Sequence, residues 1–190
     1  LNNRLELVFD WYNRTTSDML GPSVQLPSML GASVPPTNNA SLSTKGFELS
    51  VAWRDRLSSG FTYDARFLLS DNRTTILEYL NESGSINGWY KGRRHGDIWG
   101  LTTDRILQTD GEGMPDQSFY YNKWGPGDIV FKDLNGDGVI NEGTRTLDNH
   151  GDLSVIANTT PRYSFGLTAG CSWRGFDLSM IWQGIGRRDL

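Results

Sequence analysis

Residues 162–183 read RYSFGLTAGCSWRGFDLSMIWQ, two runs of alternating side chains separated by the dipeptide Arg174-Gly175. The first run places its larger and apolar side chains on odd positions: Tyr163, Phe165, Leu167, Ala169, Cys171 and Trp173. The second run places them on even positions: Phe176, Leu178, Met180 and Trp182. A period of two is typical of a β-strand and not of an α-helix. Two such runs joined by a glycine-containing dipeptide predict a hairpin with a tight turn.

The same alternation occurs earlier in the chain, in residues 4–12, 46–55 and 60–70. Together with 163–173 and 176–185, these runs predict five strands. The composition agrees, since 12% of the residues are aromatic and 22 of 190 are glycine, which favours β-structure with many turns.

The predicted connections differ strongly in length. The turns at 56–59 and 174–175 are short, whereas 13–44 and 71–162 are long. Following the chain up and down through five strands places both short turns at one end and both long connections at the other. This is the pattern of an outer-membrane barrel, with short periplasmic turns and long extracellular loops. We therefore expect one β-barrel domain over residues 1–190, with extracellular loops at 13–44 and 71–162.

Three details favour a membrane barrel over a soluble β-sandwich, which remains the alternative. Each run has about 10 residues, the length of a tilted strand that crosses a bilayer. Aromatic side chains gather near the strand ends on the apolar face: Trp11, Trp53, Phe61, Trp173, Phe176 and Trp182. The opposite face carries charges within the strands: Glu6, Glu48, Asp64 and Arg66. The expected fold class is thus all-β, an antiparallel transmembrane β-barrel fragment.

Composition also excludes several classes of protein. The net charge of −4 argues against nucleic acid as a partner. A single cysteine, Cys171, excludes an intramolecular disulfide framework and a multi-cysteine zinc site. His95 and His150 have no nucleophile or metal-ligand partner at useful spacing, so we expect no enzyme. Leu1 opens directly into a strand pattern without a signal peptide, which leads us to expect a piece of a longer chain.

The residues resemble the C-terminal part of a TonB-dependent outer-membrane transporter of the SusC/RagA type. The matching segments occur in family order along nearly the whole chain: Asp10–Leu20, Leu30–Ala32, Lys45–Leu49, Asp97–Leu101, Gly125–Asp128 running into Asp133–Asn141, Pro161–Leu167 and Gly175–Leu178. The order of seven segments makes the resemblance specific.

The resemblance implies a barrel of about 22 strands in the outer membrane of a Gram-negative bacterium, filled by a plug domain. It also implies coupling to TonB, a SusD-like surface lipoprotein as partner, and import of oligosaccharides or peptides. On this resemblance we expect the plug and the TonB-contacting segment to lie outside these 190 residues. The expected partners are then the remainder of the barrel, the plug and outer-membrane lipid. The alternative function is a soluble extracellular β-domain that binds carbohydrate and is stabilised by calcium.

Residues 133–141 read DLNGDGVIN and follow the spacing of an EF-hand-type calcium loop. The candidate Ca²⁺ ligands are Asp133, Asn135, Asp137, the Val139 carbonyl and Asn141. Thr144 stands where such a loop needs its bidentate acid, which removes the best ligand. The other interpretation is a turn in which Asx side chains bind their own backbone. No cofactor is required in either case.

The long connection at 71–162 also contains aromatic residues that are candidates for contact with a ligand or partner: Trp89, Tyr90, Trp99 and Trp124. Rings of this kind stack on sugars or peptide side chains, but they also form small cores that hold long loops together. Arg93, Arg94 and His95 form a short basic cluster that suits either an acidic ligand or a solvated loop tip.

Overall fold

The computed structural model describes residues 3–24, 29, 34–110 and 112–189. Within these residues the chain forms the strands β1 to β9 and divides into two compact units. The first unit comprises residues 1–17, 42–75 and 159–190, and the second comprises 18–41 and 76–158. The Leu30–Ala32 segment of the family resemblance lies outside the described residues.

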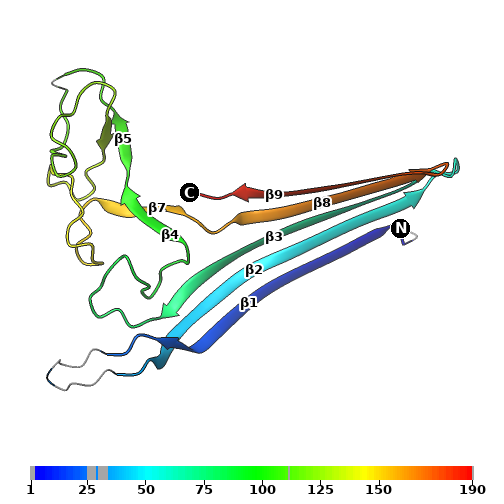
Figure 1. The fold of residues 1–190 in the computed structure, drawn as a ribbon, viewed down its shortest axis with the longest axis horizontal. Helices are drawn as coiled ribbons and strands as arrows, with labels where there is room; N and C mark the ends of the chain where they lie inside the picture. Colours follow the sequence, from blue (N-terminus) through cyan, green and yellow to red (C-terminus); the bar gives the residue numbers. More distant parts are fainter. Residues whose placement is uncertain (1–2, 25–28, 30–33, 111, 190) are drawn as a thin grey trace. The chain divides into compact units, whose positions relative to one another are not determined.

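A five-stranded sheet is the main element of the fold (Figure 1). Its strands are β1 (Leu5–Gly21), β2 (Thr37–Arg56), β3 (Thr62–Glu78), β8 (Arg162–Trp173) and β9 (Phe176–Arg187). Their order across the sheet is β1-β2-β3-β8-β9, so the chain returns to the edge of β3 after the long excursion. The five predicted strands and their antiparallel arrangement are thereby confirmed.

The register of β3, β8 and β9 separates the two faces as the sequence predicts. Leu167 on β8 lies opposite Phe67 on β3 and opposite Trp182 on β9. The next positions on this face follow in step, because Ala169 is paired with Met180 and Cys171 with Leu178. One face of this part of the sheet is therefore apolar from strand to strand.

Both short turns depend on residues with positive φ. Arg174 and Gly175, between β8 and β9, have φ values of 50° and 86°. Two consecutive residues in this region form a type I′ turn, whose twist matches that of the flanking strands. Gly60, with φ of 79°, closes the turn between β2 and β3 and donates its N–H to the Leu57 carbonyl at 3.0 Å. The prediction of tight turns at these two places is confirmed.

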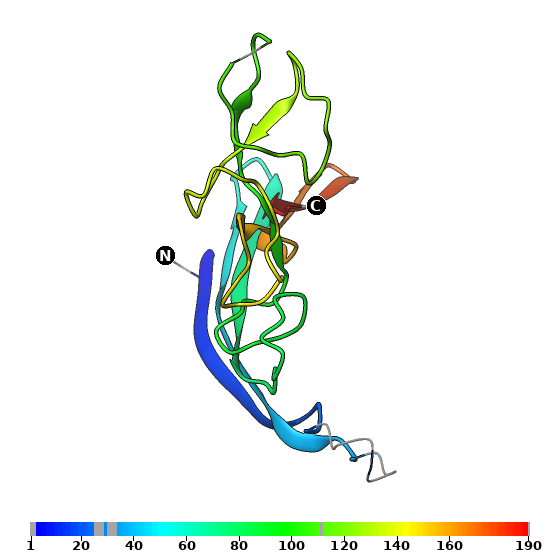
Figure 2. The same cartoon turned by 90° about the vertical axis from the view of Figure 1, so that its left-hand side faces the viewer.

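The strands extend beyond the predicted ends. Residues 13–21 and 37–44 were expected in a loop but belong to β1 and β2, and β3 continues to Glu78. These extensions are mostly polar and their few apolar residues do not alternate, so hydrophobic alternation does not reveal them. They are joined by polar pairs between strands, such as Ser43 Oγ to Asn13 Oδ1 at 3.0 Å. Figure 2 shows β1 and β2 as two neighbouring strands of this sheet.

The second unit contains two small antiparallel sheets. β4 (Asp97–Leu101) pairs with β7 (Leu153–Asn158), and β5 (Thr103–Ile106) pairs with β6 (Ile129–Phe131). Its buried apolar side chains are few: Ala40, Ile76, Ile86, Leu107, Val130, Ile140 and Leu153. The excursion is thus a folded unit of its own, although its apolar core is small for its length.

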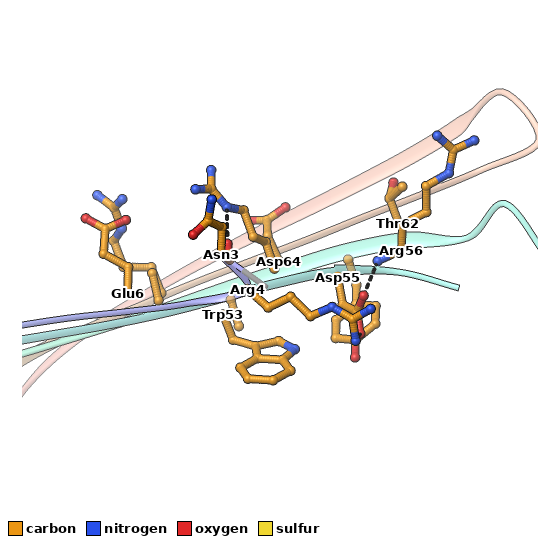
Figure 3. A pocket seen from close by; sticks show the side chains of 13 residues that line it. Asn3, Arg4, Glu6, Trp53, Asp55, Arg56, Thr62 and Asp64 are labelled. Atoms are coloured by element: carbon orange, nitrogen blue, oxygen red, sulfur yellow. Dashed lines mark hydrogen bonds and ion pairs between the residues drawn. The ribbon is translucent and has the colours of Figure 1, made fainter. Parts of the chain in front are cut away.

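The apolar face of the large sheet is uncovered in the described residues. Trp11 is 67% exposed and Phe176 is 81% exposed. Figure 3 shows Glu6 and Asp64 on one side of the sheet and Trp53 on the other, in agreement with the predicted separation of charged and apolar faces. A sheet of this kind requires an apolar environment on one side and a polar one on the other. Among the described residues, no helix is long and apolar enough to span a lipid bilayer.

Gly46 provides a test of how closely the strands of the first unit pack. A β-carbon at this position would lie 2.6 Å from the Tyr12 hydroxyl and 2.7 Å from the Asp71 carbonyl oxygen. Because the carbonyl belongs to the backbone of β3, it cannot move aside easily. We expect Gly46→Ala to destabilise the full-length parent protein by about 2 kcal/mol in denaturant unfolding in detergent. Gly88→Ala is the control, since a β-carbon there meets nothing within 4 Å, and equal unfolding of both variants would contradict the packing.

Candidate functional site

The loop at 133–141 is held by hydrogen bonds between its own side chains and backbone. The two carboxylate oxygens of Asp133 accept from the N–H groups of Gly136 at 2.6 Å and Gly138 at 2.8 Å. Asp137 accepts from the Val139 N–H at 2.8 Å and from the Asn135 side-chain amide at 2.9 Å. These are the contacts of successive Asx turns.

The remaining candidate ligand atoms are engaged in the same way. The Asn135 side-chain oxygen accepts from the Asp137 N–H at 2.9 Å. Asn141 accepts from the Gly143 N–H at 2.8 Å and donates to the Val139 carbonyl at 3.2 Å. Every oxygen proposed for calcium therefore already accepts a hydrogen bond within or next to the loop. Backbone N–H groups, with that of Gly138 contributing most, hold the pKa of Asp133 below its usual value.

The described part of the chain contains no group of three His, Cys, Asp or Glu side chains able to hold a metal ion. The candidate loop depends instead on two aspartates with amide and carbonyl oxygens. Such a set has low charge, and calcium affinity falls with the number of charged ligands.

Asp152 closes the loop from outside it. Its side chain is fully buried, and its two oxygens accept from the N–H groups of Leu134 at 2.8 Å and Asn141 at 2.9 Å. In return, the Asp152 N–H donates to the Asn141 carbonyl at 2.9 Å. One carboxylate thus joins the beginning and the end of the loop to the start of β7. Sequence reasoning missed this residue, because a lone aspartate after a glycine carries no recognisable pattern.

Two glycines allow this closure. Gly143 and Gly151 have φ values of 56° and 55°. A β-carbon on either would lie 2.7 Å from the backbone nitrogen of the other. The two segments therefore approach each other more closely than residues with side chains permit.

The four aromatic candidates are divided among separate clusters. Trp89 contacts Tyr79 and His95, with ring centroids 5.6 and 6.1 Å apart. The Trp99 indole N–H donates to the Tyr90 hydroxyl at 3.2 Å. The ring centroids of Trp99 and His150 are 5.2 Å apart.

Trp124 belongs to a third cluster, with Tyr121 at 5.8 Å and Phe131 at 6.4 Å between ring centroids. Tyr120 lies in the same cluster, and burial, followed by the nearby Glu142 carboxylate, raises the pKa of its phenol to about 12. Only Tyr90 and Trp99 of the predicted set are in mutual contact. The arrangement resembles small cores more than one continuous binding platform.

The basic cluster is also partly structural. The Arg93 guanidinium donates to the carbonyls of Ile86 and Asp97, each at 2.9 Å, and to that of Gly88. The Arg93 guanidinium therefore stabilises the loop through backbone carbonyls and is not placed to bind a ligand. Arg94 is exposed, and its backbone N–H donates to the Asp97 carboxylate at 3.1 Å while its carbonyl accepts from the Asp97 N–H at 3.2 Å.

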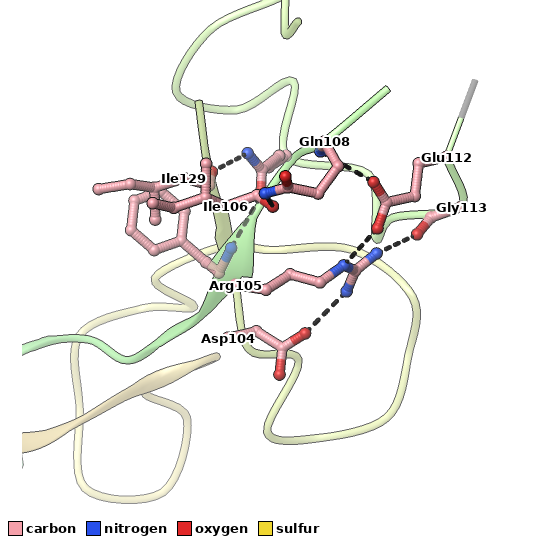
Figure 4. Close-up of polar contacts among 9 residues, drawn as sticks. Asp104, Arg105, Ile106, Gln108, Glu112, Gly113 and Ile129 are labelled. Atoms are coloured by element: carbon pink, nitrogen blue, oxygen red, sulfur yellow. Dashed lines mark hydrogen bonds and ion pairs between the residues drawn. The ribbon is translucent and has the colours of Figure 1, made fainter. Parts of the chain in front are cut away.

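Two further side chains organise the region around β5 and β6. Arg105 forms ion pairs with Glu112 at 2.9 Å and Asp104 at 2.8 Å, and it also donates to the Gly113 carbonyl (Figure 4). The fully buried Gln117 donates to the Ile129 carbonyl at 2.9 Å and accepts from the Phe131 N–H at 3.1 Å. The Gln117 amide thus forms hydrogen bonds with β6 of the kind that the backbone of a neighbouring strand would form.

Comparison with known proteins places the chain beside one group of transporters, although no family model matches it. It is 26% identical over 196 residues to TonB-dependent receptor P3 of Formosa agariphila, covering 96% of this chain and 18% of that protein. TonB-dependent receptor SusC of Bacteroides thetaiotaomicron is 27% identical over 186 residues, covering 94% of this chain and 17% of that protein. The chain therefore spans less than a fifth of the length of these two relatives.

Solved structures agree on the fold. The RagAB peptide transporter matches 95% of this chain with a TM-score of 0.61 and 21% identity, over 18% of its own chain. The RagAB peptide importer in its open-open state matches 97% of this chain with a TM-score of 0.64 and 22% identity, over 19% of its own chain. The resemblance to TonB-dependent transporters of the SusC/RagA type is thereby confirmed, as is the barrel-type fold class.

The closure by Asp152 leads to a prediction for the loop. Asp152→Asn removes the charge and one of the two acceptors, so one buried N–H loses its partner, at a cost of about 2 kcal/mol. We expect hydrogen exchange in peptides covering Leu134 and Asn141 of the full-length parent to be about thirtyfold faster. Asp148→Asn, at an exposed position, is the matched control. Unchanged exchange in Asp152→Asn would show that the carboxylate does not hold the loop.

Proposed function

We propose that this chain forms part of the wall and surface loops of an outer-membrane TonB-dependent importer in a Gram-negative bacterium. The observation that supports it best is the large sheet, with an uncovered apolar face, a charged face and short turns at one end only. Lipid suits the first face and a filled barrel interior suits the second. The similarity to TonB-dependent receptors supports the same assignment.

The sheet has two open edges, at β1 and β9. Unpaired backbone groups along an edge are costly in lipid, where water cannot bind them. The remainder of the parent barrel would pair with these edges, and a plug domain would face the charged side chains. TonB would act through the N-terminal part of the parent.

The proposed cargo is an oligosaccharide or a peptide, taken up together with a SusD-like surface lipoprotein. The RagAB proteins are described as a peptide transporter, which supports the peptide alternative by analogy alone. The second unit carries exposed aromatic side chains, including Phe119 and Tyr121, at 63% and 53% exposure. Such side chains suit contact with a cargo or a lid protein. Relatives that are receptors and transporters support a role without catalysis.

A fractionation experiment tests the assignment. We expect the full-length parent to be found in the outer membrane and to be released by detergent but not by high salt, because an apolar sheet face is buried in lipid. Disrupting its gene should abolish growth on one oligosaccharide or peptide source, and restoring it should rescue growth only in a strain with functional TonB. Release of the parent in soluble form would instead favour the soluble calcium-stabilised carbohydrate-binding domain.

The loop at 133–141 is proposed to keep its shape without calcium and to bind the ion weakly. Support comes from the internal hydrogen bonds at every candidate oxygen and from Thr144 at the position of the missing acid. Calorimetric titration of the full-length parent should then give a dissociation constant of about 1 mM or weaker. The control is Asp133→Asn, which should lose whatever heat the wild type shows. Stoichiometric binding at micromolar calcium would contradict the proposal.

A further inference from the structure

Two cations lie next to each other on the apolar face of the sheet, near the end with the long connections. Thr44 on β2 and Thr74 on β3 have their hydroxyl oxygens 2.8 Å apart, which places the two strands in register here. Because neighbouring side chains in a strand point to opposite faces, Lys45 and Arg73 follow on the other face, beside each other. Both side chains are exposed.

The same face carries the apolar side chains of these strands. Phe47, two residues after Lys45, lies against Phe9 of β1 with ring centroids 6.3 Å apart. Leu69, four residues before Arg73, belongs to the apolar set of β3. The cations therefore stand at the margin of the apolar face and not on the charged face that Glu6 and Asp64 occupy.

Neither cation forms an ion pair in contact among the described residues. The ion pairs found there involve other arginines, and neither Lys45 nor Arg73 forms a side-chain hydrogen bond. The nearest acid on β3, Asp71, also attracts Arg73, but it is bound by two nitrogens of Arg162, and the Asp71 and Arg162 side chains are 10% and 18% exposed. One carboxylate thus stands against the charges of Arg162, Arg73 and Lys45, so positive charge is in excess at this margin.

Like charges on adjacent strands destabilise a sheet unless an anion lies between them. The strands of this sheet carry exposed aromatic side chains, including Trp11 on β1 at 67% exposure and Tyr163 on β8 at 46%. Aromatic rings of this kind mark the boundary between hydrocarbon and headgroups. A cation just outside that boundary lies at the depth of the headgroup phosphates.

We propose that Lys45 and Arg73 together bind the phosphate of a lipid headgroup in the extracellular leaflet. The guanidinium of Arg73 suits two phosphate oxygens in one plane, and the ammonium of Lys45 adds a point charge from the neighbouring strand. The Arg162–Asp71 pair beside them fixes the junction of β3 and β8. The inference rests on the proposed membrane location, because only a barrel in lipid brings this margin against headgroups.

Native mass spectrometry of the full-length parent in detergent tests the inference. The probe is phosphorylated lipid A, compared with phosphatidylcholine and with inorganic phosphate. We expect lipid A to bind in preference to phosphatidylcholine, whose quaternary ammonium group neutralises its phosphate. The double variant Lys45→Gln/Arg73→Gln should bind lipid A about thirtyfold more weakly, since each cation near a membrane surface is worth about 1 kcal/mol. Arg73→Lys, which keeps the charge, should retain most of the binding.

The matched control is Lys91→Gln/Arg94→Gln, which removes two exposed cations from the long loop and should leave lipid binding unchanged. Equal lipid A binding by the wild type and the Lys45/Arg73 double variant would overturn the inference. So would displacement of the lipid by an equal concentration of inorganic phosphate, since that indicates a free-anion site. Failure of the proposed function is distinct, because the parent would then be soluble and would not enter the detergent fraction.

Discussion

The antiparallel pairing of β3 with β8 is the interaction on which the remaining structure depends. It brings together strands separated by the whole excursion between Glu78 and Arg162 and makes one continuous sheet of all five strands. Because the side-chain period is two, this register also decides which residues of β8 and β9 lie on the apolar face. A slip of one residue would turn Leu167 and Cys171 to the charged side. The Arg162–Asp71 pair lies where the two strands separate and secures that register.

The second unit follows a different principle. Its buried apolar side chains are few. Individual polar side chains stabilise it instead, by forming hydrogen bonds with backbone groups. Asp152 does this for the loop at 133–141, Gln117 for β6, and Arg93 for the turn before β4. Each is engaged by at least two backbone groups. The loop resembling a calcium site is therefore best understood as part of the framework that shapes this surface unit.

The sequence reveals the strands with an apolar face well because apolar alternation leaves a strong pattern, as at Tyr163–Trp173. It conceals the extensions of β1 and β2, where residues such as Asn13 and Ser43 are polar and pair across strands. Asp152 and Gln117 are equally hidden, because their partners are backbone groups far along the chain and a carboxylate or amide carries no spacing signal. The aromatic residues were recognisable as a set, but their division into clusters depends on the fold of the loop.

The difference between the two kinds of connection also has a kinetic consequence. The type I′ turn at Arg174-Gly175 lets β8 and β9 meet within microseconds, and the turn at Gly60 does the same for β2 and β3. Joining the two hairpins requires closure of the long excursion, which is much slower for contacts so distant in sequence. In that interval each hairpin exposes an apolar face and an unpaired edge. These surfaces make the segment prone to aggregation until β3 and β8 meet.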